Sequence, residues 1–341
     1  MTNSTITIKD LNDEKFRKLL APIVFLVITL IIGIPGNLTV LIIYGKKYAK
    51  SVHRTIVWNL AVADQIFCTI GIPFNIARIV HYYSFEGEWA CVVFVVLLYF
   101  LLLYSTHLLV LLSIHRFWKI CFPLRQQISL DNVNYWIIAC FGISFVLSAP
   151  HFGLSKYEEI SVRYNLTGYS CAISQSNPSI YSIVFSYGYL ALFILYTIIL
   201  IVIYLMIGWT LYKQQKRRIE KHITSSTQKA ISSKMTKIAF AISIVFAVSY
   251  IPLFILQITT KTIDKDDLNT FQFAMLRIGE RLYVVNHVAN PFIYGLFDKQ
   301  FKKHFKELVT CGWSRAETNS CTIESTSAIE IQLDQSKNSV A

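Results

Sequence analysis

Long apolar stretches alternate along this chain with short polar connectors. Seven of these stretches reach the length of about 20 residues that a helix needs to cross a bilayer, and they lie at 19–44, 55–81, 90–114, 133–152, 180–212, 236–258 and 271–296. They lack the short polar and apolar alternation of membrane barrel strands. Because only helices or closed barrels satisfy their backbone groups in lipid, the pattern predicts an all-α membrane protein, a bundle of seven transmembrane helices.

Composition and charge support this class and exclude others. The chain is 54% hydrophobic and only 15% charged, with a mean hydropathy of +0.48, which is too apolar for a soluble protein of 341 residues. The net charge of +12 lies in short connectors between the apolar runs, so we expect no nucleic-acid partner. The seven cysteines lack CxxC spacing and so suggest neither a zinc site nor a redox pair. The sequence contains no set of a nucleophile and a base, so we do not expect an enzyme.

Lysine and arginine are concentrated in alternate connectors, which orients the bundle. The first connector, 45–55, carries four of them and the segment 213–237 carries eight, whereas the intervening connectors contain acidic residues. The N-terminus is therefore expected outside and the C-terminus inside the plasma membrane. Residues 1–18 would form an extracellular segment without a signal peptide. Residues 19–309 would form the membrane domain with its seven crossings, and 310–341 a disordered cytoplasmic tail.

Three modification signals follow from this orientation. Asn3 and Asn165 head Asn-x-Ser/Thr sites on the outer side and are expected to be glycosylated, whereas Asn37 matches the pattern inside the first span and should be unmodified. Cys311 follows a segment, 297–309, in which phenylalanines recur every four residues among lysines. This segment is expected to be a short amphipathic helix in contact with lipid on the inner leaflet, and Cys311 to be either palmitoylated or a free thiol.

A set of short fragments occurs one per predicted helix, in a fixed order. They are Gly36-Asn37, LAVAD ending at Asp64, Cys91 and His115-Arg116-Phe117, Pro150, Tyr204, Phe246 with Tyr250-Ile251-Pro252, and Asn290-Pro291-Phe292-Ile293-Tyr294. Together they resemble the rhodopsin-like (class A) G-protein-coupled receptors over roughly 21–308, and the last fragment is that family's NPxxY intact. The resemblance implies a receptor that binds an extracellular ligand and activates a heterotrimeric G protein, with arrestin and a receptor kinase as further partners.

The resemblance also implies roles for individual residues in activation. The kink at Pro252 would be the hinge about which the inner half of the sixth helix swings outward. The residues of the coupling face and activation switch would be His115, Arg116, Phe117, Tyr204, Phe246, Tyr250, Pro252, Pro291 and Tyr294. Relatives usually carry an acid where this chain has His115, and that acid holds the neighbouring arginine in the resting state. We therefore expect basal signalling above that of a His115→Asp variant; in the alternative, apolar packing of Phe117 and Ile114 holds the resting state.

Two further features follow from the family pattern. Cys91 and Cys171 both belong to the oxidising outer face, so a disulfide is expected to tie the second outer loop to the third helix. Asp64 is an ionisable group in mid-membrane and needs partners. Ser105, Asn286 and Asn290 are available, and the resemblance implies a sodium ion among them; a plain hydrogen-bond network is the alternative, and His287 stands where relatives carry a small residue.

The candidate ligand pocket excludes two ligand classes. Val284 stands where opsins carry the retinal lysine, and Leu98 where amine receptors carry an aspartate. The remaining lining expected on the upper helices is aromatic and polar with both signs of charge: Asn75, Arg78, Tyr99, Gln257, Glu280 and Arg281. This lining favours a peptide, although Arg78 and Glu280 would also suit each other as an ion pair.

Two other functional classes stay open at this point. An ion channel or transporter would use the polar residues around Asp64 as its path, but the chain shows no inverted repeat. A receptor-like scaffold that does not signal would explain the altered motifs, which include Tyr196 at the usual fifth-helix proline and Tyr250 at the usual tryptophan.

Overall fold

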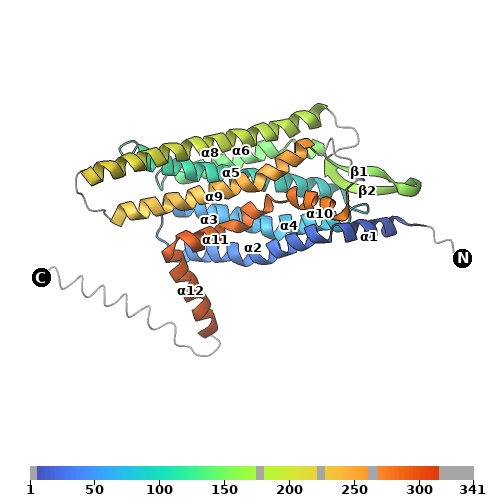
Figure 1. Ribbon diagram of the computed structural model, residues 1–341, viewed down its shortest axis with the longest axis horizontal. Helices are drawn as coiled ribbons and strands as arrows, with labels where there is room; N and C mark the ends of the chain where they lie inside the picture. The colour runs from blue at the N-terminus through green and yellow to red at the C-terminus, as the bar shows by residue number, and fades with distance from the viewer. Residues whose placement is uncertain (1–5, 174–179, 221–226, 260–267, 315–341) are drawn as a thin grey trace.

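The computed structural model describes residues 6–173, 180–220, 227–259 and 268–314, which form an elongated bundle of near-parallel helices (Figure 1). In chain order the elements are α1 Ile8–Lys18, α2 Leu20–Lys46, α3 Val52–Ile66, the π-helical turn η1 Phe67–Gly71, α4 Ile72–Val80, α5 Glu88–Cys121, α6 Val133–Ser148, α7 His151–Leu154, β1 Ser155–Val162, the short η2 Arg163–Asn165, β2 Leu166–Ile173, α8 Ile180–Glu220, α9 Thr227–Thr259, α10 Thr270–Gly279, α11 Val284–Phe297 and α12 Lys299–Ser314.

The helices confirm the predicted bundle of seven crossings. Six helical stretches of the described chain are long and apolar enough to span a bilayer, namely Leu20–Lys46, Val52–Val80, Glu88–Cys121, Val133–Gly153, Ile183–Arg217 and Thr236–Leu256. The seventh run, predicted as one helix over 271–296, is instead α10 and α11 joined by a tight turn at 280–283. Gly279 comes just before this turn and lies against Leu256 of α9, where a Cβ atom would come within 2.7 Å of that side chain.

A proline contact joins the first and last crossings. Pro291 has no N–H, so the carbonyl of His287 one turn earlier loses its helical partner. The amide of Asn37 in α2 donates to that carbonyl at 2.9 Å. Gly36 permits the approach, because a Cβ there would lie 3.0 Å from the Pro291 ring. Asn37 is fully buried, in agreement with its expected lack of glycosylation.

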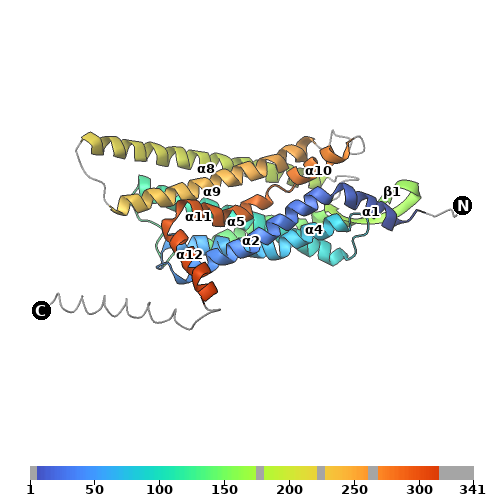
Figure 2. The ribbon, with the colours of Figure 1, turned by 60° about the horizontal axis from the view of Figure 1, so that its bottom comes forward.

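One end of the bundle carries α1 and the antiparallel hairpin β1–β2 (Figure 2), and we call it the hairpin end. The hairpin turns at Tyr164 and Asn165, whose φ angles of 67° and 56° are left-handed. Helix α1 begins with a capping box between Thr7 and Asp10, and the hydrogen bonds from Thr7 lower the pKa of the Asp10 carboxyl. Asn12 of α1 joins this helix to the chain that follows α4 by donating to the carbonyl of Val80. Neither α1 nor the hairpin β1–β2 was predicted from the sequence.

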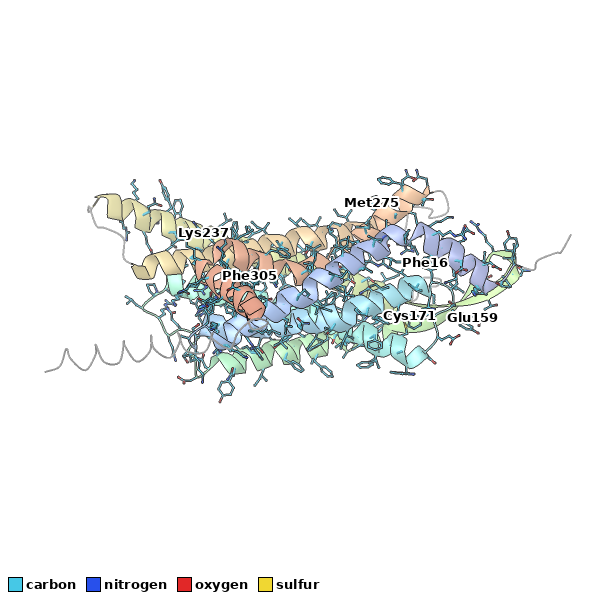
Figure 3. The ribbon with its side chains drawn as sticks, turned by 90° about the horizontal axis from the view of Figure 1, so that it is seen from below. Phe16, Glu159, Cys171, Lys237, Met275 and Phe305 are labelled. Atoms are coloured by element: carbon cyan, nitrogen blue, oxygen red, sulfur yellow. A yellow bond between two sulfur atoms is a disulfide. The ribbon has the colours of Figure 1, made fainter. Side chains whose placement is uncertain are left out.

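The opposite end carries α12, which turns away from the bundle axis (Figure 1). We call it the α12 end; Figure 3 shows Lys237 and Phe305 toward this end and Phe16, Glu159, Cys171 and Met275 toward the hairpin end. The amphipathic helix predicted over 297–309 is found as Lys299–Ser314. Phe301 is buried against Tyr44 and Tyr294, whereas Phe305 is exposed.

Candidate ligand-binding and signalling sites

The predicted disulfide between Cys91 and Cys171 is present and joins the start of α5 to strand β2. The same strand is held by Arg78 of α4, whose Nε donates to the carbonyl of Cys171 at 3.0 Å. Arg78 therefore does not form the ion pair with Glu280 that the sequence left open. These contacts fix the second loop against α4 and α5 at the hairpin end, where the candidate ligand pocket was predicted.

A charged group lies on α10 and the turn after it, among the residues of the candidate ligand pocket. Nη1 of Arg277 lies 2.8 Å from Glu280, and its Nη2 donates to the hydroxyl of Tyr82 at 2.7 Å. Arg281 contacts the same Glu280 oxygen at 3.4 Å and donates to the carbonyl of Arg277 at 2.9 Å. Two cations thus share one carboxylate.

The floor of the pocket is aromatic and polar. Tyr99 stacks on His151 with ring centroids 3.5 Å apart and also packs near Tyr189. The hydroxyl of Tyr283 donates to Asn75 at 3.4 Å. The structure thus brings Asn75, Arg78, Tyr99, Glu280 and Arg281 to one end of the bundle, and Leu98 is buried against η1 beside Gly71. The side chain of Gln257 lies outside the described residues.

Asp64 lies in the middle of the bundle, fully buried and held by three donors. Ser105 donates to Oδ1 at 2.9 Å, His287 Nδ1 lies 2.7 Å from the same oxygen, and Asn290 donates to Oδ2 at 2.6 Å. Asn286 is buried nearby but is not among the described donors to this carboxylate. The His287 ring stacks on Phe67 with centroids 4.0 Å apart.

This arrangement does not fit a sodium ion. Sodium needs several oxygen ligands, whereas both oxygens of Asp64 already accept hydrogen bonds and two of the three donors are nitrogens. The His287 imidazole occupies the space that a smaller residue would leave. The residues form the hydrogen-bond network that was the alternative interpretation, and no group of three potential metal ligands occurs in the part of the chain that the structure describes.

The predicted switch residues lie toward the α12 end. Arg116 is buried and makes no ion pair with any described residue, and its Nε has no hydrogen-bond partner. The neighbouring His115 is also buried, and its Nδ1 is unpaired. Phe117 packs on Phe122, the residue that follows the same helix. The acid that would hold this arginine is absent, as the sequence indicated.

The two switch tyrosines have separate partners. Tyr204 of α8 shares hydrogen bonds with Ser113 of α5 at 3.0 Å and Ser243 of α9 at 3.4 Å. Tyr294 of α11 packs instead on the Tyr44 ring at 5.3 Å, and its buried hydroxyl has no described partner. Tyr204 thereby links the three helices that line this end.

Phe246 and Tyr250 form an aromatic column on α9, six and two residues before Pro252. Their centroids are 4.9 Å apart, and Phe193 of α8 packs against both. Pro252 lies within α9 beside this column. A bulky aromatic is therefore retained at the position of the usual tryptophan.

An ion pair that the sequence analysis missed closes the α12 end. Lys234, near the start of the described α9 side chains, pairs with the fully buried carboxylate of Asp298. Oδ1 of Asp298, which faces Lys234, also accepts a hydrogen bond from the N–H of Gln300 at 2.9 Å and so caps α12. Oδ2 accepts a hydrogen bond from Tyr48 at 2.8 Å. The pair joins the sixth crossing to the corner between α11 and α12.

Comparison with known proteins decides the family. The model of the rhodopsin family of seven-transmembrane receptors matches residues 36–294, which is most of the chain and includes the Asp64 network and both switch tyrosines. The chain belongs to this receptor family. The bundle, the disulfide and the charged pocket are therefore parts of a receptor.

Individual relatives are distant but cover most of this receptor. The allatostatin-A receptor of Bombyx mori is 25% identical over 82% of this chain and 77% of its own length. The type-1 angiotensin II receptor A of Xenopus laevis is 26% identical over 93% of this chain and 86% of its own, and the neuropeptide Y receptor type 2 of Sus scrofa is 24% identical over 91% and 81%.

Several residues of the receptor's sites were not singled out from sequence. Arg277 lies four residues before Arg281, so their shared helical face was a usable signal. Asp298 lies at the start of the predicted amphipathic helix, where an aspartate is a common N-cap. For Lys234 no local signal existed, because eight lysines and arginines occur in that region.

Proposed function

We propose that this receptor lies in the plasma membrane with its hairpin end outside and binds an extracellular peptide there. The observation that carries the proposal is the pocket at the hairpin end of a family member, with aromatic rings and charges of both signs around Tyr99, Arg78 and Glu280. Relatives named for ligands such as neuropeptide Y support the peptide. Lysine-rich connectors at the α12 end support this orientation.

The peptide would act by shifting a population, not by catalysis. In the closed arrangement α9 is held at the α12 end through Lys234 and Tyr204. Peptide binding would favour a state in which α9 swings outward about Pro252 and exposes Arg116 to a heterotrimeric G protein. An arrestin and a receptor kinase would use the same face, with the tail at 310–341 as kinase substrate.

The covalent modifications and lipid contact belong to the same proposal. Asn165 is exposed at the hairpin tip, as a glycosylation site requires. Asn3, the second proposed glycosylation site, lies outside the described residues. Cys311 falls in α12, and palmitate there, with the exposed ring of Phe305, would hold this helix on the inner leaflet.

The test is ligand-triggered nucleotide exchange. Cells expressing the full chain are screened against a peptide library with a second-messenger readout, and hits are repeated as GTPγS binding on membranes. Exchange without ion current supports the proposal. Current without exchange would make the protein a channel or transporter, and peptide binding without exchange would make it a scaffold.

A further inference from the structure

The pocket at the hairpin end contains more positive charge than it can pair. Arg277 and Arg281 share Glu280, which is the only carboxylate paired with either of them in the described part of the chain, and Arg78 lies at the same end of the bundle without an ion pair there. The Arg277 and Arg281 side chains are only 12% and 15% exposed. Like charges in such a poorly solvated site repel each other strongly.

The three arginines differ in how far their N–H groups are used. Arg277 uses both of its Nη atoms, which reach Glu280 and Tyr82, although its Nε is buried without a partner. Arg281 uses only Nη1, and its Nε is buried without a partner. Arg78 uses Nε on the Cys171 carbonyl, and neither of its Nη atoms bonds to a described residue. Arg281 and Arg78 therefore both have unused donors at the hairpin end of the bundle.

Unused guanidinium donors have a matching chemical partner. A planar guanidinium binds a carboxylate through two parallel N–H···O bonds, and such charge-assisted pairs are stronger than neutral ones. A single carboxylate between the two arginines would neutralise the excess charge and satisfy donors that are now unpaired. Tyr283 lies at the same end of the bundle, where its hydroxyl donates to Asn75 of α4, the helix that carries Arg78.

We propose that this pocket binds a carboxylate of the peptide ligand, with Arg281 and Arg78 as the residues that hold it and Arg277 as a positioning residue. The inference rests on the proposed peptide-receptor function and adds the chemistry that selects the peptide. The carboxylate belongs either to the peptide's free C-terminus or to an aspartate or glutamate side chain.

The first test needs no ligand. The melting temperature of the full-length receptor in detergent is measured for Arg281→Gln and for Arg277→Gln. Because Arg281 is kept for a ligand, its neutralisation relieves repulsion and should raise the melting temperature by about 2 °C. Arg277→Gln removes engaged donors and should lower it. A fall for Arg281→Gln would show a structural arginine and overturn the proposal.

The second test separates the two carboxylate sources. Four pools of random octapeptides are assayed by nucleotide exchange: with a free or an amidated C-terminus, each with or without aspartate and glutamate. We expect exchange only from pools that contain a carboxylate. The free-terminus pool without acidic residues reports the C-terminal source, and the amidated pool with them reports the side-chain source.

Variants complete this second test. At equal surface expression Arg281→Gln should weaken the active pool by about 30-fold or more, whereas Arg163→Gln, at the exposed hairpin turn, should respond as the wild type does. Equal activity from the amidated pool without acidic residues would overturn the carboxylate and leave the peptide receptor standing. The variant Asp298→Asn, which signals without ligand, shows that the assay detects exchange in these cells. If none of the four pools then triggers exchange, both the peptide-receptor function and the carboxylate recognition are overturned.

Discussion

The ion pair between Lys234 and Asp298 should limit the ligand-free signalling of this receptor. Outward movement of α9 must separate the two residues, because Lys234 moves with the helix and Asp298 stays at the corner of α11 and α12. Asp298→Asn removes the charge but keeps a good N-cap for α12. The change is therefore expected to weaken the closed state without unfolding the helix that follows.

The magnitude follows from burial. Removing one partner of a fully buried pair costs about 3–5 kcal/mol. Here the Asp298 side chain is fully buried but Lys234 is 23% exposed, so solvent screens the pair and we expect about 1–2 kcal/mol. A change of this size raises the ratio of open to closed receptor about 5- to 30-fold.

The assay is ligand-free GTPγS binding at matched surface expression. Lys234→Gln should raise basal exchange about as much as Asp298→Asn, and the double variant should add little, since either change alone breaks the pair. Lys237→Gln is the matched control, because this exposed lysine lies one turn further along α9. Basal exchange at the wild-type level in both single variants, or full additivity in the double variant, would refute the reasoning.

Three further predictions concern other parts of the bundle. His115→Asp places an acid beside Arg116 and should lower ligand-free exchange; equal exchange at equal expression would contradict it. His287→Ser frees space at Asp64 and should create a dependence of agonist affinity on sodium at constant ionic strength, which the wild type should lack; sodium dependence in the wild type would contradict the misfit. Cys171→Ser opens a loop of 80 residues and should cost about 4 kcal/mol on the loop-entropy model, measured as a lower melting temperature; an unchanged value would show that the remaining loop contacts suffice.

The bundle was predictable because each crossing is encoded locally. A run of about 20 apolar residues must be helical in lipid whatever its neighbours are. The break in the seventh crossing was not predictable in this way, since it depends on the close contact between Gly279 and Leu256 of another helix. The hairpin β1–β2 was missed for a similar reason, because its register depends on pairing across a turn at Tyr164 and Asn165.

For the site residues, too, local sequence patterns were predictable and contacts between distant residues were not. Residues within a recognisable fragment, such as Asp64 and Asn290, were found and do meet in the structure. Contacts between residues far apart in the chain were not, and Lys234 with Asp298 is the clearest case, because 64 positions separate them. His287 was noticed as unusual, but only the geometry shows that it donates to Asp64 in place of an ion.

The departures from the family pattern are compensated by contacts elsewhere, which argues that signalling is retained. His115 supplies no acid for Arg116, but the pair of Lys234 and Asp298 holds α9 to the corner between α11 and α12 at the same end of the bundle. Tyr196, at the usual fifth-helix proline, bonds His107 of α5 at 2.7 Å and so fixes the helix that a proline would have bent. A scaffold that had lost its function would have no need for replacement restraints on the helices that must move. The closed bundle therefore retains a restraint that a ligand can release.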